Sequence, residues 1–596
     1  MFKSAVAVIL AAWSSNIAAS VINSASNSAQ DIEYISIYAK RHTIAQQQVL
    51  ASITVLDRAE IMARQADDLP NLLSQLVGIN LSRDGGRGQN ASVYIRGGNT
   101  GHSLVLIDGV RLGSATLGYK ALSMVPLELI ERIEVIRGPR AAFYGADALS
   151  GIIAITTRDN NKGLEINANV GSYGQVGADI SASHTVEELT LRATVGGSIA
   201  DGFNSQPNLD ADKDGYQQQF VKVAADYQTR FGLWQAQTDL SSGQYEFDSP
   251  WSDEDQADIL NRNYLLGWQQ QLGQWQHQLQ LSRSVDSDTS FGPNTRSPFI
   301  TERDELNYQA FSQINSSLTL LGGVNWYQEQ VDRSATAYEQ TSRINRAIFT
   351  GISYQQNGLQ LEVAARRDMF NQYGAENTWQ LAVGYQLVQN WLVRASRATA
   401  FKIPSFNALY YPGYANPNLK PEQSLADELA LRYSSAQLQL ELSWFQRDVT
   451  NLIQGIEQAE NVTLAKIVGI ELSMAQQWRK FSNELAYTWL DTKNVSTGNK
   501  LERRPENTLN WRLSYTAAEW SAFVTADYQS ATFQGDFAPV ANLPSFTVWG
   551  LGASYQLSSK LVLRTAVNNL FDKQYQTSAG YATAGANVKL SLSYRL

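Results

Sequence analysis

The sequence predicts an all-β transmembrane barrel of about 22 antiparallel strands, preceded by an N-terminal α+β domain that lies inside the barrel as a plug. Three observations predict this fold. The first residues have the pattern of an export signal, and no later apolar helix is predicted. The alternation of apolar residues has period two from about Gly163 to the end, and the segment before Gly163 is patterned differently.

The first residues predict export. Lys3 precedes an apolar run from Ala5 to Trp13, and small residues follow at positions 18–20, in the order of a cleavable secretory signal over residues 1–20. The alternative for this segment is a disordered tail. After Trp13 no stretch of eighteen apolar residues occurs, so the sequence predicts no transmembrane helix.

Residues 32–41, "IEYISIYAKR", alternate apolar and polar positions directly after the predicted signal. An extended and unpaired segment of this kind can add as an edge strand to a partner protein, with main-chain hydrogen bonds supplying affinity. We therefore predict a coupling handle here. The alternative is an ordinary first strand of the next domain.

Residues 42–160 predict a compact α+β domain. A short helical stretch, "DLPNLLSQLVGI", is followed by the brief strands "VYIRG", "LVLIDGV" and "IERIEVIRGP". The glycine-rich run from Gly85 to Gly101 has no Lys-Ser/Thr pair after it, so we interpret it as tight turns and not as a phosphate-binding loop.

Residues 161–596 predict the barrel. "LTLRATVGG" places Leu189, Leu191, Ala193 and Val195 on one face, and "VKLSLSYRL" at the C-terminus repeats the pattern. About 22 strands leave about 20 residues for each strand with its connection. Every backbone amide and carbonyl must be paired within hydrocarbon, so the sheet must close. The alternative is a soluble protein of several β-sandwiches.

Composition excludes several classes of function. The formal net charge of -9 argues against a nucleic-acid binder, and the absence of cysteine excludes disulfides and thiolate sites. The four histidines, His42, His102, His184 and His277, are isolated, which argues against a zinc site; we interpret them as surface or packed polar residues. No G-x-S-x-G motif with a matching histidine is present, so we do not expect an enzyme.

Acidic residues gather in two predicted loops. Asp210, Asp212 and Asp214 alternate before Gly215, as at the start of an EF-hand loop, but Val221 stands where that loop would end in glutamate. About one hairpin later, "YEFDSPWSDEDQADI" supplies a second group. Carboxylates at this density repel one another, and a divalent cation with oxygen ligands relieves that repulsion. The alternative is a hydrated acidic loop without an ion.

Several motifs resemble the plug of TonB-dependent outer-membrane receptors: "SVYIRGG", "LVLIDGVRL" and above all "ELIERIEVIRGPRAAFYGADALSGIIAITTR", residues 128–158. "AVNNLFDKQYQ", residues 566–576, is similar to the final-strand signature of the same receptors, so the resemblance covers the mature chain. Within the superfamily, "RATAFKIPSFNALYYPGYANPNLKPEQS" and "GGRGQNASVYIRGG" resemble cobalamin receptors, although ferric-siderophore receptors share parts of the first motif.

The resemblance implies a monomer in outer-membrane lipid that imports cobalamin with energy from TonB, ExbB and ExbD and delivers it to a periplasmic cobalamin-binding protein. It places a TonB box at Glu33, Tyr34, Ile35, Ser36, Ile37 and Tyr38. It implies bound calcium with the ligands Asp210, Asp212, Asp214, Asp248 and Asp258. The substrate contacts that it implies are Asn90, Ser92, Asn99, Leu117, Gly118 and Arg503.

Three positions depart from the family pattern. Asp210 stands where an amide is common, Asn204 where an aspartate is expected, and Leu596 where a terminal aromatic residue is usual.

A passive porin or adhesin would need neither plug nor handle. A ferric-siderophore receptor therefore remains as the alternative function.

Overall fold

The computed structural model describes residues 35, 36, 38, 39, 41, 44, 45, 48–158, 163–209, 211–249, 252–455, 457–535 and 541–596. The predicted signal peptide, Glu33, Tyr34, Ile37 and Asp210 lie outside these residues, as does the predicted boundary between residues 160 and 161. No described helix is long and apolar enough to cross a membrane.

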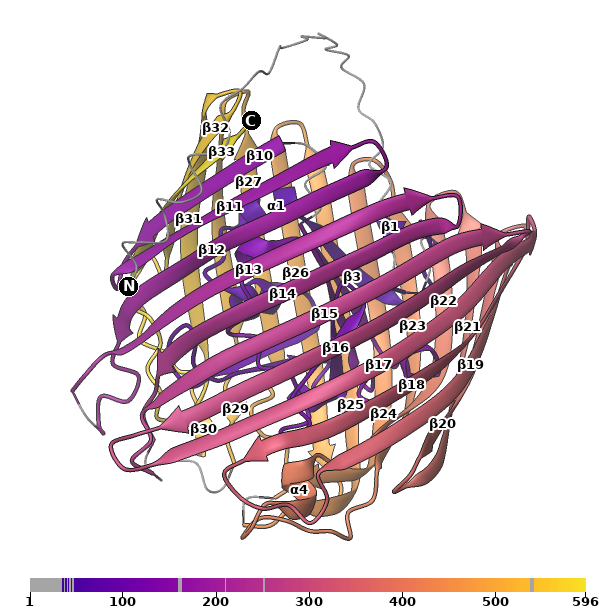
Figure 1. Cartoon of the computed structure of the whole chain (residues 1–596). Coiled ribbons are helices and arrows are strands. Elements are labelled where there is room, and N and C mark those ends of the chain that lie inside the picture. The colour runs from indigo at the N-terminus through magenta and orange to yellow at the C-terminus, as the bar shows by residue number, and fades with distance from the viewer. Residues whose placement is uncertain are drawn as a thin grey trace. The chain divides into compact units, whose positions relative to one another are not determined.

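The described C-terminal part forms one closed antiparallel barrel, and the predicted 22 strands are confirmed (Figure 1). Each strand pairs with the next along the chain, β28 pairs with β31, and β10 pairs with β33 to close the sheet. The strands are β10 (Gly163–Gly171), β11 (Gln175–Val186), β12 (Leu189–Phe203), β13 (Asp214–Thr229), β14 (Gly232–Glu246), β15 (Gln256–Leu272), β16 (Trp275–Phe291), β17 (Arg296–Asn315), β18 (Leu318–Ser334), β19 (Ser342–Gln356), β20 (Leu359–Phe370), β21 (Gly374–Val388), β22 (Trp391–Lys402), β23 (Glu422–Ser434), β24 (Leu438–Gln454), β25 (Glu460–Trp478), β26 (Phe481–Asn494), β27 (Asn507–Thr516), β28 (Trp520–Gln529), β31 (Phe546–Ser558), β32 (Leu561–Asn568) and β33 (Asn587–Arg595).

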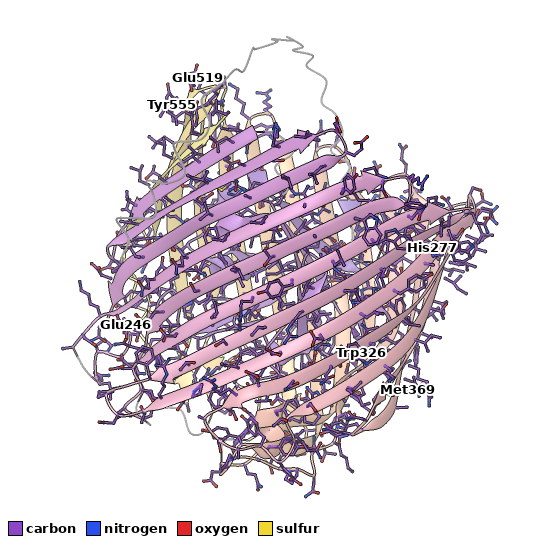
Figure 2. All side chains as sticks on the ribbon, viewed as in Figure 1. Glu246, His277, Trp326, Met369, Glu519 and Tyr555 are labelled. Carbon is purple, nitrogen blue, oxygen red and sulfur yellow. The ribbon has the colours of Figure 1, made fainter. Side chains whose placement is uncertain are left out.

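The two faces of the barrel are inverted relative to a soluble protein. On β11 the apolar Val176 and Ile180 are 51% and 45% exposed, while the polar Asp179 and Ser181 are 2% and 1% exposed. Period-two alternation therefore turns apolar side chains outward, where only lipid can cover them. Figure 2 shows Trp326 and Tyr555 on this outer surface. The soluble multi-sandwich alternative is wrong.

Connections differ between the two ends. At one end they are short turns such as 187–188 and 230–231, and at the other they include long segments, which we number outer loops 1 to 11 in chain order. The four that matter below are outer loops 2 (204–213), 3 (247–255), 9 (495–506) and 11 (569–586). Outer loop 7 carries α4 (Phe406–Tyr410), and the sheet of β29 (Thr532–Phe533) and β30 (Asn542–Leu543) lies in outer loop 10 (Figure 1).

The plug is built on a five-stranded sheet in the order β3-β8-β9-β6-β7. Apolar side chains of this sheet and its helices form the plug core, and Asp57 caps α1 with a reciprocal Glu60 contact. A separate hairpin pairs β4 with β5. The elements are β3 (Ser52–Asp57), α1 (Arg58–Arg64), α2 (Leu69–Ser74), β4 (Ile79–Arg83), β5 (Ala91–Ile95), η2 (Thr100–His102), β6 (Ser103–Ile107), β7 (Val110–Leu112), η3 (Leu127–Leu129), β8 (Ile130–Arg137), α3 (Ala141–Tyr144) and β9 (Gly151–Thr157).

Barrel side chains meet the plug from every side, which places it inside the barrel as predicted. Lys222 of β13 bonds Asp108 at 2.6 Å, Arg447 of β24 bonds Ser150 at 2.7 Å, and Lys589 of β33 bonds the Ala66 carbonyl at 3.2 Å. Strands far apart around the ring thus contact one enclosed domain.

A buried ion cluster anchors the plug to β23, β24 and β25. Arg96 donates two bonds of 2.8 Å to Glu471 and one of 2.6 Å to Glu428, and Arg137 donates to Glu471 at 3.2 Å. On the barrel side, Arg394 bonds Glu428 at 3.0 Å. Paired charges of this kind hold geometry because removal of one partner leaves the other charge buried and uncompensated.

Candidate functional site

The tip of the β4–β5 hairpin brings two predicted substrate residues together. The Asn90 amide donates to Asp84 Oδ2 at 2.8 Å, and Arg503 Nη1 lies 3.9 Å from Asp84 Oδ1. Asn90 is exposed, and Ser92 on β5 is half-buried opposite Ser82. Asp84 therefore joins a plug loop to outer loop 9. The sequence analysis missed it because an aspartate before two glycines also fits a simple turn.

Asn99 lies in the next plug loop and is held by two neighbours. Its side-chain oxygen accepts from Arg504 Nη2 at 2.5 Å, and its backbone N–H donates to His102 Nδ1 at 3.2 Å. Nδ1 is then the unprotonated nitrogen, so Nε2 carries the proton toward Glu422 Oε2 at 3.1 Å. Burial lowers the pKa of His102, an effect that Glu422 only partly offsets, so the ring is neutral.

Leu117 and Gly118 form a second apex of the plug. Leu117 is 43% exposed, and the Gly118 carbonyl accepts from Lys402 Nζ at 2.7 Å. A Cβ at Gly101 would lie 2.8 Å from that same carbonyl, so this apex touches the loop that carries Asn99. Lys402 also bonds Asp147 at 3.0 Å. Burial alone would raise the pKa of Asp147, but Lys402 and Arg111 more than offset it and hold the pKa at about 2.

Outer loops 2 and 3 lie side by side, as predicted. Asp214 accepts from the Ser205 N–H at 2.7 Å, and Asp248 accepts from the Ser205 hydroxyl at 3.2 Å and the Gln206 N–H at 3.0 Å. Gln89 of the plug donates to Ser205 Oγ at 3.3 Å. The two predicted carboxylates thus converge on one backbone segment that touches the plug.

The remaining predicted calcium ligands are placed differently. Asp258 lies on β15 and accepts from Gln244 at 3.2 Å, with Arg296 at 3.7 Å. Strand alternation turns it to the outer face, whereas the neighbouring Ala257 and Ile259 are buried. Asp212 lies in outer loop 2. The described residues contain no group of three or more His, Asp or Glu side chains arranged to hold a metal ion.

The predicted handle packs against the plug. β1 (Ile35–Ser36) pairs antiparallel with β2 (Ile44–Ala45). The Tyr38 N–H donates to Glu134 at 3.3 Å, and the Tyr144 hydroxyl donates to the Tyr38 carbonyl at 2.8 Å. Gln309, near the short-turn end of β17, donates to the Arg41 carbonyl at 2.7 Å. The segment therefore lies toward the short-turn end.

Two family models match successive parts of the chain. Residues 45–152 match the TonB-dependent Receptor Plug Domain, and residues 155–570 match the TonB dependent receptor-like beta-barrel. The chain is a TonB-dependent receptor. Such receptors reside in the outer membrane, work with TonB and are transporters or receptors and not enzymes, which places the short turns of this receptor in the periplasm and its outer loops outside the cell.

Curated relatives resemble the receptor over nearly its full length. It is 32% identical over 569 residues to the "Vitamin B12 transporter BtuB" of Photobacterium profundum, covering 92% of this chain and 93% of that one. It is 30% identical over 607 residues to the transporter of the same name from Vibrio vulnificus, covering 95% and 96%.

Solved structures resemble the receptor in fold. A mutant of the ferric enterobactin receptor PfeA of Pseudomonas aeruginosa superposes with a TM-score of 0.81 at 19% identity, covering 92% of this receptor and 99% of PfeA. The siderophore receptor PirA of Acinetobacter baumannii gives 0.81 at 17% identity, with coverage of 92% and 99%. The copper transporter OprC gives 0.77 at 18% identity, with coverage of 89% and 96%. These similarities concern the fold alone.

Proposed function

We propose that this receptor imports cobalamin, as vitamin B12 or a related corrinoid, across the outer membrane. The observation that carries the proposal is its likeness, at 30% and 32% identity over nearly the full chain, to two vitamin B12 transporters. The solved siderophore receptors share only 17–20% identity with it. The names of these two sets of proteins give different substrates, vitamin B12 for the first and siderophores for the second.

The polar groups at the plug apices suit a large ligand with a fringe of amides. Asn90, Ser92 and Asn99 offer neutral donors and acceptors, and the exposed Leu117 offers an apolar contact. Arg503 in outer loop 9 approaches the same surface through Asp84. A few well-placed polar groups in a mostly apolar setting orient a ligand of this kind.

Calcium in outer loops 2 and 3 belongs to the same proposal. Asp214 and Asp248 meet at Ser205, and Asp210 and Asp212 precede Asp214 in the chain, so these four carboxylates would share one cation. Calcium accepts six to eight oxygen ligands and would cross-link the two loops. Asp258, which faces Arg296, would complete the set only from the outer face.

Energy reaches the receptor through its handle. Residues 32–41 would act as the TonB box, pairing as an edge strand with TonB, which ExbB and ExbD energise, while a periplasmic cobalamin-binding protein accepts the substrate. In the part of this segment that the structure describes, two residues of β1 pair with two of β2, which is a small barrier to that exchange. The receptor would work as a monomer.

The test is a titration of the detergent-purified receptor with cyanocobalamin, with calcium present and after chelation. We expect saturable binding that weakens on chelation. A ferric tris-catecholate serves as the competing ligand, because the fold neighbours include ferric enterobactin receptors. Saturable binding of the ferric complex without binding of cyanocobalamin would replace the proposal with the siderophore alternative.

A further inference from the structure

Two consecutive residues of outer loop 9, Arg503 and Arg504, contact the plug hairpin β4–β5 and the residues that follow it. The Arg503 carbonyl accepts from the Asn80 amide at 3.1 Å. Arg504 Nε donates to the Gly97 carbonyl at 3.1 Å, directly after the hairpin. The Arg504 guanidinium also stacks over the Tyr94 ring of β5, with its carbon 4.1 Å from the ring centroid.

Arg504 is buried, and the hydrogen bonds described for it go to uncharged oxygens. Its side chain is part of a residue only 8% exposed, and in the part of the chain that the structure describes its hydrogen bonds go to the Gly97 carbonyl, the Asn99 side-chain oxygen and the Glu502 carbonyl. Burial lowers its pKa. Tyr94 and Glu502 raise the pKa and only partly offset burial. The planar fork of arginine fixes two plug acceptors at once, the Gly97 carbonyl and the Asn99 side-chain oxygen, so Arg504 holds the geometry of this contact.

The contact between outer loop 9 and the plug has a residue proposed to touch substrate on each of its two sides. Arg503 precedes Arg504 on outer loop 9, and Asn99 is bonded by Arg504 itself at 2.5 Å. A substrate surface made of both parts therefore exists only while loop and plug stay in contact. Resting on the proposed function, we propose that Arg504 is a positioning residue that joins outer loop 9 to the plug apex into one substrate surface, which comes apart when the plug is pulled.

Other outer loops attach to the same hairpin. Ser82 of β4 donates to the Thr577 carbonyl of outer loop 11 at 2.9 Å, and the Thr577 hydroxyl accepts from the Arg83 N–H at 3.0 Å. Gln89 at the hairpin tip contacts outer loop 2 at Ser205 and donates at 3.0 Å to the carbonyl of Glu246, the last residue of β14 before outer loop 3. Displacement of the β4–β5 hairpin would therefore loosen several outer loops of the substrate site together. The affinity for substrate would then fall at the moment of transport.

The first test replaces the guanidinium. Arg504→Gln and Arg504→Lys should each weaken cyanocobalamin binding at least about tenfold, because neither side chain spans both acceptors. Lys500→Gln is the matched control, since Lys500 is on the same loop but pairs with the exposed Glu506. Heat-dependent gel migration checks that each barrel is folded.

A ligand-free measurement accompanies the titration. The chain has no cysteine, so a nitroxide at Ser496→Cys reports outer loop 9 alone. We expect a more mobile label in the Arg504 variants than in the parent or in Lys500→Gln. A folded Arg504→Gln receptor with parental affinity and parental label mobility would overturn the proposal. Failure of the unaltered receptor to bind cyanocobalamin would instead overturn the proposed function. The mobility of the label would still test whether Arg504 holds outer loop 9 against the plug.

The second test prevents separation. Ser82→Cys with Thr577→Cys can be joined by oxidation or by a short thiol cross-linker, because the two residues are in contact and are outside the proposed substrate contacts. The tethered receptor should bind cyanocobalamin as tightly as its reduced form but import it at less than about a tenth of the reduced rate. Import by the tethered receptor at the reduced rate would refute separation as the release step. The single-cysteine variants are the controls.

Discussion

Replacing Glu471 with glutamine should loosen the plug without opening the barrel. Glu471 accepts from Arg96 twice at 2.8 Å and from Arg137 at 3.2 Å, and both arginines are almost fully buried. A glutamine of the same shape keeps one acceptor oxygen but points an N–H group at the guanidinium donors. Arg96 would retain Glu428, whereas among the described residues Arg137 would retain the Thr54 hydroxyl at 2.7 Å and no carboxylate within hydrogen-bond distance.

The expected loss in the free energy of unfolding follows from the partners that Arg96 and Arg137 keep. Removing one partner of a buried ion pair costs about 3–5 kcal/mol, and Arg137 loses its carboxylate entirely. Hydrogen exchange of the β8 amides, which open with the plug, should accelerate roughly 10²- to 4 × 10³-fold, since each 1.4 kcal/mol is about a factor of ten. Amides of the barrel strands far from β25 should exchange at the parental rate.

A matched exposed pair provides the control. Lys500 and Glu506 lie 2.8 Å apart with side chains 53% and 44% exposed, so Glu506→Gln should cost less than about 1 kcal/mol. If Glu471→Gln leaves exchange in β8 within threefold of the parent, the ion cluster does not hold the plug, and the reasoning from buried charge is refuted.

Three further outcomes are expected. The free energy of unfolding of the plug should fall by about 2 kcal/mol as pH falls from about 4 to about 2, because Asp147, with its lowered pKa, stabilises the fold only while its carboxyl is ionised. Asp147→Asn should remove this part of the acid dependence in thermal unfolding. Ile35→Pro should abolish uptake and leave surface binding intact, and equal loss of both would contradict the coupling role. Joint replacement of Asp212 and Asp214 by alanine should weaken calcium and cyanocobalamin binding in titrations, and unchanged affinities would exclude both residues from the site.

The barrel could be predicted from the sequence because lipid imposes a rule that each strand obeys locally. Apolar residues such as Val176 and Ile180 must alternate with inward polar ones, and that alternation is visible without knowing any partner strand. The short helical stretch "DLPNLLSQLVGI" and the brief plug strands were also predicted from their local sequence, and the structure has a helix at residues 69–74.

The contacts of the site were harder to predict because they join residues hundreds of positions apart. Nothing near Arg504 in the sequence indicates that it meets Asn99, and His102 was interpreted as a surface or packed polar residue without its partner Glu422. Asp248 and Asp258 were placed in one set of calcium ligands by the family resemblance. Only the start of β15 at Gln256 decides that Asp258 follows the strand's alternation and faces outward.

The order of elements along the chain explains how a pull on the N-terminus can reach the substrate site late. In the proposed mechanism, force on the handle would first load the contacts of Tyr38 and Arg41. It would next load Ser52 at the start of β3, whose hydroxyl accepts from Arg394 at 2.6 Å and lies 2.9 Å from Glu428. β3 is an edge strand of the five-stranded sheet, so it can leave β8 without breaking the other strand pairs. The hairpin β4–β5 follows only after α1 and α2, so the contacts of Arg504 are loaded after the handle and β3 have yielded. A chain arranged in the reverse order would release its substrate before transport had begun.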